Sequence, residues 1–168
     1  MNINFVYNNN YAFTNAIYSM WLCKEYLNED ILFLTGDLVF ESKVVRDMIN
    51  SNSNTVYAEF KNKLNNKDFK FEVGNNGYIK EISVNVVGKT CFPIYKISKL
   101  SMEIWMAEVD KLILQDKTNL YAEDAFNNIS DKINLMPMYT TDFCMEIDDH
   151  KDLLEAKKYY KKNDPLLD

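Results

Sequence analysis

The feature that most constrains the fold of this chain is the unbroken apolar run ILFLT at residues 31–35. Its residues do not alternate between apolar and polar types, as they do in a strand that has one face in water. The run therefore predicts a strand that is covered on both faces, in a sheet with other layers packed on either side. It stops at Gly36-Asp37, where the chain is expected to turn.

The rest of the chain alternates between strand and helix patterns. Asn76-Gly77, flanked by alternating apolar residues, predicts a hairpin over residues 68–86, because these two residues tolerate a positive φ. Alternating strands and helices imply a layered α/β fold, to which the hairpin adds an antiparallel part. No repeat or linker is visible, so residues 1–168 are expected to form a single domain. The other expected strands are residues 2–7, 55–58, 91–97 and 142–147, and the expected helices are residues 11–27, a short helix capped by Ser42, a helix from Ser101, residues 122–133 and a final helix after Asp148-Asp149.

Composition narrows the class of protein. The 168 residues are 47% hydrophobic and 26% charged, which excludes a disordered chain. The net charge is −6 and Arg46 is the single arginine, a balance that disfavours nucleic acid as a partner, because duplex binding uses clustered Lys and Arg. No signal-peptide pattern is present, and no apolar run reaches the ~20 residues of a membrane span. The odd count of widely spaced cysteines suggests reduced thiols, and we expect a cytoplasmic protein that is not in a membrane.

Several kinds of active site are excluded by missing motifs. The four glycines are too far apart for a dinucleotide-binding G-x-G-x-x-G or a phosphate-binding P-loop. His150 is the single histidine, which excludes the H-E-x-x-H zinc motif and every site with several His ligands. No serine lies in G-x-S-x-G.

Acidic residues remain as the candidates for chemistry. Asp37 follows the apolar run, and Glu146, Asp148 and Asp149 lie where a second strand gives way to the last helix. Ligands in open α/β sheets gather at the carboxyl ends of strands. Carboxylate oxygens that converge there suit Mg²⁺, which leaves its other positions to water and substrate phosphate. The alternatives are that Asp148 or Asp149 caps the final helix and that Asp37 only supports a turn.

Longer motifs occur in order along the chain: YNNNYAFTNAIYSMWLC, DILFLTGDLVF, IYKIS, YAEDAFN and FCMEIDDHKDLLEAKKY. In this order they resemble the later part of bacterial sugar-phosphate and phosphocholine nucleotidyltransferases. The sharpest elements are T-G-D-L-V-F and E-I-D-D-x-x-D-L, and the resemblance runs from Met1 to Tyr160. It implies a three-layer α/β/α, Rossmann-like nucleotidyltransferase fold of the nucleotide-diphospho-sugar transferase type, with a mixed sheet and a shortened N-terminus.

The resemblance also implies an activity. Members of the family transfer a nucleotidyl group from a nucleoside triphosphate to a phosphorylated acceptor and release pyrophosphate. For this chain the implied reaction is transfer of CMP from CTP to phosphocholine or a sugar phosphate. The family's Mg²⁺ ligands correspond to Asp37, Glu146 and Asp148, with Asp37 as the catalytic residue. Such catalysis depends on positioning and electrostatics, so it needs no His or Cys nucleophile.

Four more residues match substrate-binding segments of the family. Glu123 and Asp124 match an acidic pair of the acceptor site, and Tyr11 and Asn15 match the segment around the acceptor and nucleotide pocket. The alternative for Glu123 and Asp124 is a solvated first helical turn that interacts favourably with the helix dipole. The alternative for Tyr11 and Asn15 is a polar entry to a helix.

The chain departs from the family at its start. Family members begin with a Gly-rich G-x-G-x-R segment and a Lys that hold the triphosphate, and no counterpart is present here. By resemblance the chain starts at the family's third strand, which leaves an edge of the strand at residues 31–35 without its neighbour. An uncovered apolar edge favours aggregation. We therefore expect an N-terminal partner chain, a second copy or a rearranged sheet to cover that edge.

The acceptor group is a separate question. Aromatic residues are abundant enough for a cage around a quaternary ammonium, with Trp21, Tyr95 and Tyr139 as candidate walls, although a place in the buried core is the favoured interpretation of each. Three hypotheses of function remain. The first is a nucleotidyltransferase that needs an N-terminal part, and the second is a non-catalytic remnant that acts as a binding or assembly subunit. The third, an unrelated α/β protein, predicts that Asp37 and Asp148 lie far apart.

Overall fold

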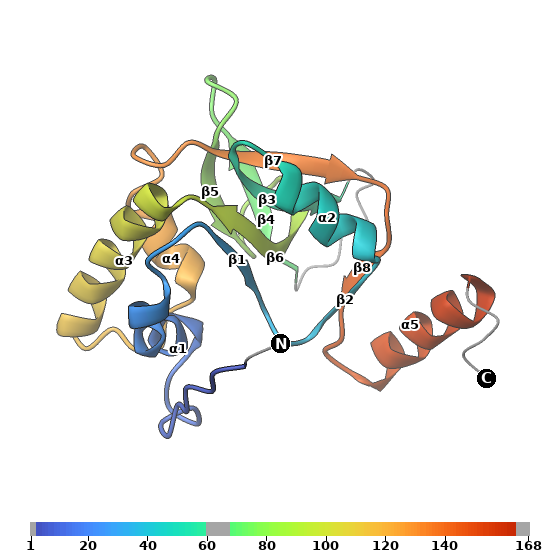
Figure 1. Cartoon of the computed structure of the whole chain (residues 1–168), viewed down its shortest axis with the longest axis horizontal. Helices are drawn as coiled ribbons and strands as arrows, with labels where there is room; N and C mark the ends of the chain where they lie inside the picture. Colours follow the sequence, from blue (N-terminus) through green and yellow to red (C-terminus); the bar gives the residue numbers. More distant parts are fainter. Residues whose placement is uncertain (1–2, 60–67, 164–168) are drawn as a thin grey trace.

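A computed structural model describes residues 3–59 and 68–163 of the chain. Helices and strands alternate along it, as expected (Figure 1). The helices are α1 (Ala16–Leu22), the short 3-10 helix η1 (Lys24–Tyr26), α2 (Ser42–Asn50), α3 (Lys99–Leu114), α4 (Ala122–Asn127) and α5 (His150–Asn163). The strands are β1 (Ile31–Leu34), β2 (Leu38–Phe40), β3 (Asn54–Glu59), β4 (Lys70–Val73), β5 (Ile79–Ser83), β6 (Lys89–Ile97), β7 (Leu135–Thr140) and β8 (Cys144–Glu146).

The main sheet is built around β6. In the described residues its strand order is β5-β4-β6-β3-β7, and β1 also pairs with β6. Along one edge of β6, its beginning pairs with β4 and its end pairs with β1, with Ile31 opposite Ile97. Along the other edge, β6 pairs with β3. The β3–β7 pair is parallel and the other pairs are antiparallel. The expected mixed sheet is therefore confirmed.

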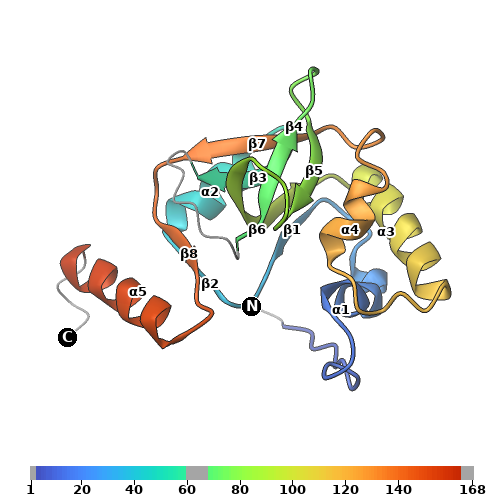
Figure 2. The same ribbon diagram turned by 180° about the vertical axis from the view of Figure 1, so that it is seen from behind.

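Helices cover both faces of this sheet (Figures 1 and 2). On one face, α1, α3 and α4 bury a large core in which Trp105 is fully enclosed and donates its indole N–H to the Ala122 carbonyl at 3.0 Å. On the other face, Val44 and Met48 of α2 form a smaller core. Alternate residues of β1 pack into the two cores, Phe33 into the first and Leu34 into the second. The strand at residues 31–35 is thus covered on both faces, as its sequence predicts.

A short ribbon and a helix extend from this layered body. β2 and β8 pair antiparallel, with Leu38 opposite Glu146, and α5 follows β8 (Figure 1). Leu38 and Phe40 of the ribbon pack against the α2 side of the core. The ribbon is therefore anchored to the body by apolar contacts on one of its faces.

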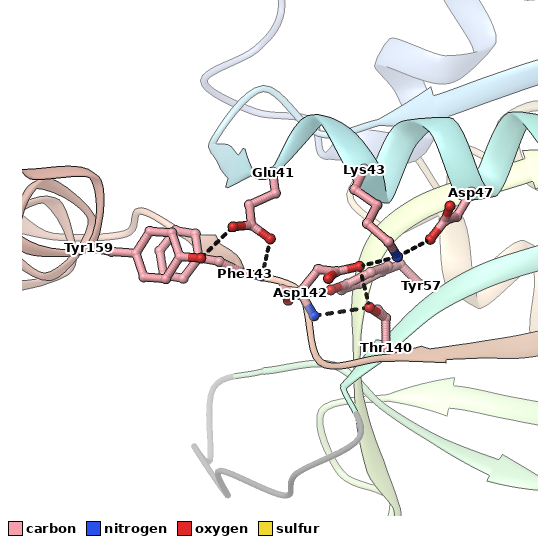
Figure 3. A network of polar contacts seen from close by, with 8 residues as sticks. All are labelled: Glu41, Lys43, Asp47, Tyr57, Thr140, Asp142, Phe143 and Tyr159. Atoms are coloured by element: carbon pink, nitrogen blue, oxygen red, sulfur yellow. Dashed lines mark hydrogen bonds and ion pairs between the residues drawn. The ribbon is translucent and has the colours of Figure 1, made fainter. Parts of the chain in front are cut away.

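A polar network fixes the connection between β7 and β8 (Figure 3). Lys43 of α2 pairs with Asp142 at 2.9 Å, and Asp142 also accepts a hydrogen bond from the Thr140 hydroxyl at 2.8 Å. The Tyr57 hydroxyl donates to the Asp142 carbonyl at 2.7 Å. Beside it, Phe143 stacks on Tyr159 of α5 with ring centroids 3.8 Å apart. The network ties β8 to α2 and to α5.

Some expected elements differ from those observed. Residues 3–7 alternate like a strand but pair with no described strand, and Phe5 is 74% exposed. The helix expected at 11–27 is shortened to α1 and η1, and α4 ends well before residue 133. Ser42 is the first residue of α2 and does not cap it, because Glu41 occupies the cap position. β2 and β7 were not expected, whereas the hairpin turn at Gly77, with φ of +82°, is confirmed.

The described part of the chain has no helix long and apolar enough to span a membrane.

The network around Asp142 gives a first prediction. Lys43, and then the Thr140 hydroxyl, hold the pKa of Asp142 below its usual range, so this carboxylate stabilises the folded state above its ordinary pKa and loses that effect as pH falls through the lowered value. Asp142→Asn is therefore expected to lower the Tm by roughly 2–4 °C at pH 7, and by progressively less as the pH falls below the ordinary pKa of 3.8. Differential scanning fluorimetry across pH measures this.

The matched control is Asp47→Asn, which removes the other carboxylate paired with Lys43 but leaves the β7–β8 connection intact. It is expected to cost less than Asp142→Asn. An equal loss in both variants, or a loss that does not shrink as the pH falls below 3.8, contradicts the role given to Asp142.

Candidate functional site

A cavity of about 290 Å³ lies at the carboxyl end of β1. Five of the residues predicted from the sequence line it: Asn15, Asp37, Glu123, Glu146 and Asp148. Its aromatic walls are Phe33, Phe69 and Tyr121. Residues from the start, middle and end of the chain thus meet at one place.

The β2–β8 ribbon brings the two acidic motifs together. Asp37 directly precedes β2, and Glu146 is the last residue of β8 and lies opposite Leu38. The Ile147 N–H donates to the Asp37 carbonyl at 2.9 Å, which extends the pairing by one more hydrogen bond. Asp37 and Asp148 therefore line the same cavity, and the hypothesis of an unrelated fold with these residues far apart is wrong.

The cap of the last helix is Asp149 and not Asp148. The Asp149 carboxylate accepts from the backbone N–H groups of Lys151 and Asp152, at 2.8 and 3.0 Å. The Asp152 carboxylate accepts in return from the N–H of Asp149 at 3.3 Å. This reciprocal arrangement satisfies the first turn of α5. Capping therefore does not require the side chain of Asp148, which lines the cavity.

The surroundings of Glu146 change the acidity of its carboxyl. Its side chain is partly buried, and this loss of water, followed by the negative charges of Asp37 and Asp148, raises its pKa to about 7. In this environment the ionised form of the Glu146 carboxyl is unfavourable unless a positive charge lies nearby. A cation at this position would relieve the repulsion.

Glu123 enters the cavity from the first turn of α4 and is held by Tyr95. It is only 4% exposed, and its carboxylate accepts a 2.7 Å hydrogen bond from the Tyr95 hydroxyl. Burial raises the pKa of Glu123. Asp124 has a different role, because its carboxylate accepts from the Tyr121 N–H at 2.8 Å at the start of α4. Of the expected acidic pair, Glu123 lines the cavity and Asp124 supports the helix end.

The two residues expected near the start of the chain also separate. Asn15 lines the cavity and caps α1, because its side-chain oxygen accepts from the Ala16 N–H at 2.7 Å. Tyr11 is 77% exposed and does not line the cavity. Of the two residues matched in this segment, Asn15 lines the cavity and Tyr11 does not.

The suggested aromatic cage is not assembled from the residues that were named for it. Trp21 donates its indole N–H to Asp110 at 2.7 Å, away from the cavity, and Tyr139 lies against Lys89. Tyr95 is fully buried beneath the cavity, where it orients Glu123. The sequence held no signal for the actual walls, because Phe69 and Tyr121 directly precede β4 and α4, and the place of these elements beside the cavity depends on the tertiary fold.

The charge of the cavity is one-sided. None of its described lining residues is a Lys, Arg or His, whereas four are carboxylates. The Thr35 hydroxyl also lines it and is buried with no hydrogen-bond partner. A second hollow, of about 650 Å³, shares Glu146 and Asp148 with the first. These two carboxylates therefore border both spaces.

Within residues 3–59 and 68–163, no three His, Cys, Asp or Glu side chains converge as a preformed metal site. A complete set of protein ligands is not what Mg²⁺ usually requires, since it takes one or two carboxylates and completes its shell with water and phosphate oxygens. Two of the three carboxylates that line the cavity, Asp37, Glu146 and Asp148, would be enough for a metal of that kind.

The sequence matches no protein-family model and no curated protein. The structure, in contrast, is similar to solved nucleotidyltransferases. It matches the CTP:phosphocholine cytidylyltransferase of Streptococcus pneumoniae with a TM-score of 0.75 and 17% identity, over 92% of this chain and 67% of that one. It matches the inositol-1-phosphate CTP transferase of T. maritima with a TM-score of 0.69 and 16% identity, over 92% and 65% of the two chains.

A third similar structure is the UDP-glucose pyrophosphorylase of Acinetobacter baumanii, with a TM-score of 0.64 and 13% identity, over 90% of this chain and 57% of that one. The chain thus spans between about half and two thirds of the length of these proteins. The chain has the mixed α/β fold of the nucleotide-diphospho-sugar transferase type, which these nucleotidyltransferases share.

Proposed function

We propose that this chain is a nucleotidyltransferase domain that transfers a nucleotidyl group, CMP from CTP, to a phosphorylated acceptor and releases pyrophosphate. One observation carries the proposal. Asp37, Glu146 and Asp148 come from two strand ends far apart in the sequence and line one cavity at the carboxyl end of β1. The fold that places them there is the fold of known nucleotidyltransferases.

Mg²⁺ is the proposed cofactor, and its protein ligands would be drawn from Asp37, Glu146 and Asp148. When bound, it would neutralise phosphate charge in the transition state. This supply of positive charge is needed because the described lining of the cavity contains carboxylates and no basic side chain. Burial and then the charges of Asp37 and Asp148 raise the pKa of Glu146, and the ion would offset both effects.

The protein's own residues would bind and orient the two substrates. In the reaction, a phosphate oxygen of the acceptor forms a bond to the α-phosphorus of the nucleotide, and the bond to the leaving pyrophosphate breaks in line with it. Asn15 offers an amide at the rim of the cavity, and Glu123 offers a carboxylate whose orientation is fixed by Tyr95. The two hollows that share Glu146 and Asp148 give room for two substrates on either side of these carboxylates.

The acceptor proposed here is phosphocholine or a related cationic phosphate ester. The first cavity combines a buried carboxylate, Glu123, with the aromatic side chains of Phe33, Phe69 and Tyr121. Aromatic faces and a carboxylate are the groups that recognise a quaternary ammonium. A neutral sugar would leave Glu123 without a counter-charge, which is costly at a buried position.

The domain is proposed to act together with another polypeptide strand. In the described part of the structure β1 pairs only with β6, so its outer edge has no strand beside it. Both faces of β1 are already covered, and an added strand would continue the same layers. An N-terminal partner chain or a second copy of this chain would supply that strand.

A non-catalytic binding or assembly subunit is the second candidate. The observation that favours it is the lack of a basic side chain in the described lining of the cavity, since a triphosphate normally needs cations in addition to Mg²⁺. Nucleotide binding by the chain distinguishes the two candidates.

The environment of Glu146 predicts how the stability of the fold depends on pH. A carboxyl with a raised pKa stabilises the fold in its protonated form, so the contribution of Glu146 is lost as pH rises from its ordinary value of 4.5 to about 7. Glu146→Gln is expected to match the wild type at pH 4 and to be more stable at pH 8, by about 1–2 kcal/mol after allowance for solvent screening. Thermal and urea unfolding measure the difference.

Mg²⁺ gives the second arm of this test. At pH 8 it is expected to raise the Tm of the wild type and to have little effect on Glu146→Gln. Glu103→Gln, which removes an exposed carboxylate of α3 far from the cavity, serves as the control and should behave like the wild type. An equal response to Mg²⁺ in all three proteins argues against a site at Glu146.

Nucleotide selectivity tests the proposed activity. The Tm of the chain is measured with Mg²⁺ and each of CTP, UTP, GTP and ATP. A ligand present at a hundred times its dissociation constant should stabilise the folded state by ~2.7 kcal/mol. A shift with CTP that disappears in Asp37→Ala supports the proposal, whereas a folded protein that responds to none of the four favours the non-catalytic subunit.

The open edge of β1 predicts a pattern of hydrogen exchange. Because the Thr35 N–H donates toward β6, to the Pro93 carbonyl at 3.3 Å, alternation along the strand points the N–H groups of Leu32 and Leu34 outward. In an isolated chain these two amides should exchange much faster than that of Phe33. Slow exchange at all three, together with a mass above 19.8 kDa in light scattering, would show that a second copy covers the edge.

A further inference from the structure

One polar group of the candidate site lacks a partner within the protein. The hydroxyl oxygen of Thr35 is buried and makes no hydrogen bond in the described structure, whereas most buried polar side-chain atoms of folded proteins have one. Thr35 directly follows β1 and is one of the residues that line the acidic cavity. Because a buried hydroxyl without a partner is unfavourable, one that lies beside a cavity points to a ligand that completes it.

The strand before Thr35 determines which face of the sheet its side chain is on. Side chains alternate along β1, so that Phe33 packs into the core on the α1, α3 and α4 side and Leu34 into the core on the α2 side. The Thr35 N–H donates to the Pro93 carbonyl at 3.3 Å, which continues the pairing of β1 with β6 for one more residue. Thr35 therefore lies on the same face as Phe33, which also lines the cavity.

The sheet leaves the end of β1 incompletely hydrogen-bonded at this point. In a hydrogen-bonded pair of antiparallel strands, two opposite residues exchange two N–H···O=C bonds. Pro93 has no N–H, so it accepts from Thr35 but cannot donate in return. Polar groups of Thr35 are thus left without a partner from β6, two residues before Asp37, from which a metal ligand is proposed.

We infer that Thr35 is a substrate-binding residue whose hydroxyl donates a hydrogen bond to the phosphate of the acceptor. This inference rests on the proposed function, which supplies the ligand. None of the described residues that line the cavity is basic, so a phosphate there needs uncharged donors in addition to Mg²⁺. Thr35 offers a hydroxyl, and Asn15 offers its NH₂ group, since the oxygen of its amide accepts from the Ala16 N–H. One step between staggered rotamers about the Cα–Cβ bond would turn the Thr35 hydroxyl toward the ligand.

The stability of the ligand-free protein tests whether the hydroxyl has a use in the fold. Thr35→Val keeps the shape of the side chain and removes its hydroxyl. Because that hydroxyl has no partner in the folded protein, the Tm of the variant is expected to equal or exceed that of the wild type. Thr90→Val is the matched control, because the Thr90 hydroxyl is also buried without a partner but Thr90 does not line the cavity. A lower Tm for Thr35→Val would overturn the inference.

Binding of phosphocholine to the full chain with Mg²⁺, measured by isothermal titration calorimetry, tests the contact itself. Thr35→Val is expected to weaken binding by about tenfold or more, and Thr90→Val by less than about twofold. Thr35→Ser keeps the hydroxyl and should bind within about threefold of the wild type. An equal loss of affinity for choline, which has no phosphate, would place the contact elsewhere and overturn the inference.

The same titrations separate this inference from the proposed function. If the wild type binds phosphocholine and Thr35→Val binds it equally well, the role of Thr35 is wrong and the proposed function stands. If the wild type binds no phosphocholine in the presence of Mg²⁺, the proposed acceptor and the role of Thr35 are both wrong.

Discussion

The candidate site depends on the pairing of β2 with β8. These strands are only three residues long, and yet their ladder, extended by the hydrogen bond from the Ile147 N–H to the Asp37 carbonyl, joins two acidic motifs from distant parts of the chain. A ribbon of this size is not stable alone. It is maintained because Leu38 and Phe40 pack into the core on the α2 side, and because the network around Asp142 fixes the incoming end of β8.

The same ribbon separates an acidic cavity on one of its faces from a mainly apolar surface on the other. Because neighbouring side chains on a strand point to opposite faces, one register places Glu146 at the acidic cavity and Ile147 beside the apolar face of α5. A slip of one residue would exchange these environments and bury the wrong groups. The register is set by the apolar side chains that pack on the core, so the stability of the ribbon and the chemistry of both its faces have a common origin.

Much of the fold could be predicted from the sequence where the local signal was strong. The apolar run at 31–35 and the turn at Gly77 are such cases. β7 was missed because Pro137 interrupts its pattern, and the structure explains why Pro is tolerated there. In the described residues β7 pairs only with β3, so it is an edge strand on which a missing N–H costs little. Residues 3–7 show the opposite error, since alternation alone does not make a strand without a partner for its backbone.

The candidate site, like the fold, could be predicted where the local sequence signal was strong. Acidic residues at strand ends could be found by type and position, which singled out Asp37, Glu146, Asp148 and Asp149. The family resemblance selected the three of these that line the cavity. Tyr95 could not be assigned its role, because its contact with Glu123 joins β6 to α4 through the core. The four carboxylates of the cavity, without a basic side chain in its described lining, form an arrangement that electrostatics disfavours unless cations neutralise it. Such repulsion is maintained in a folded protein when the charge has a use, and the use that we propose here is to hold a divalent cation and a cationic acceptor at the carboxyl end of β1.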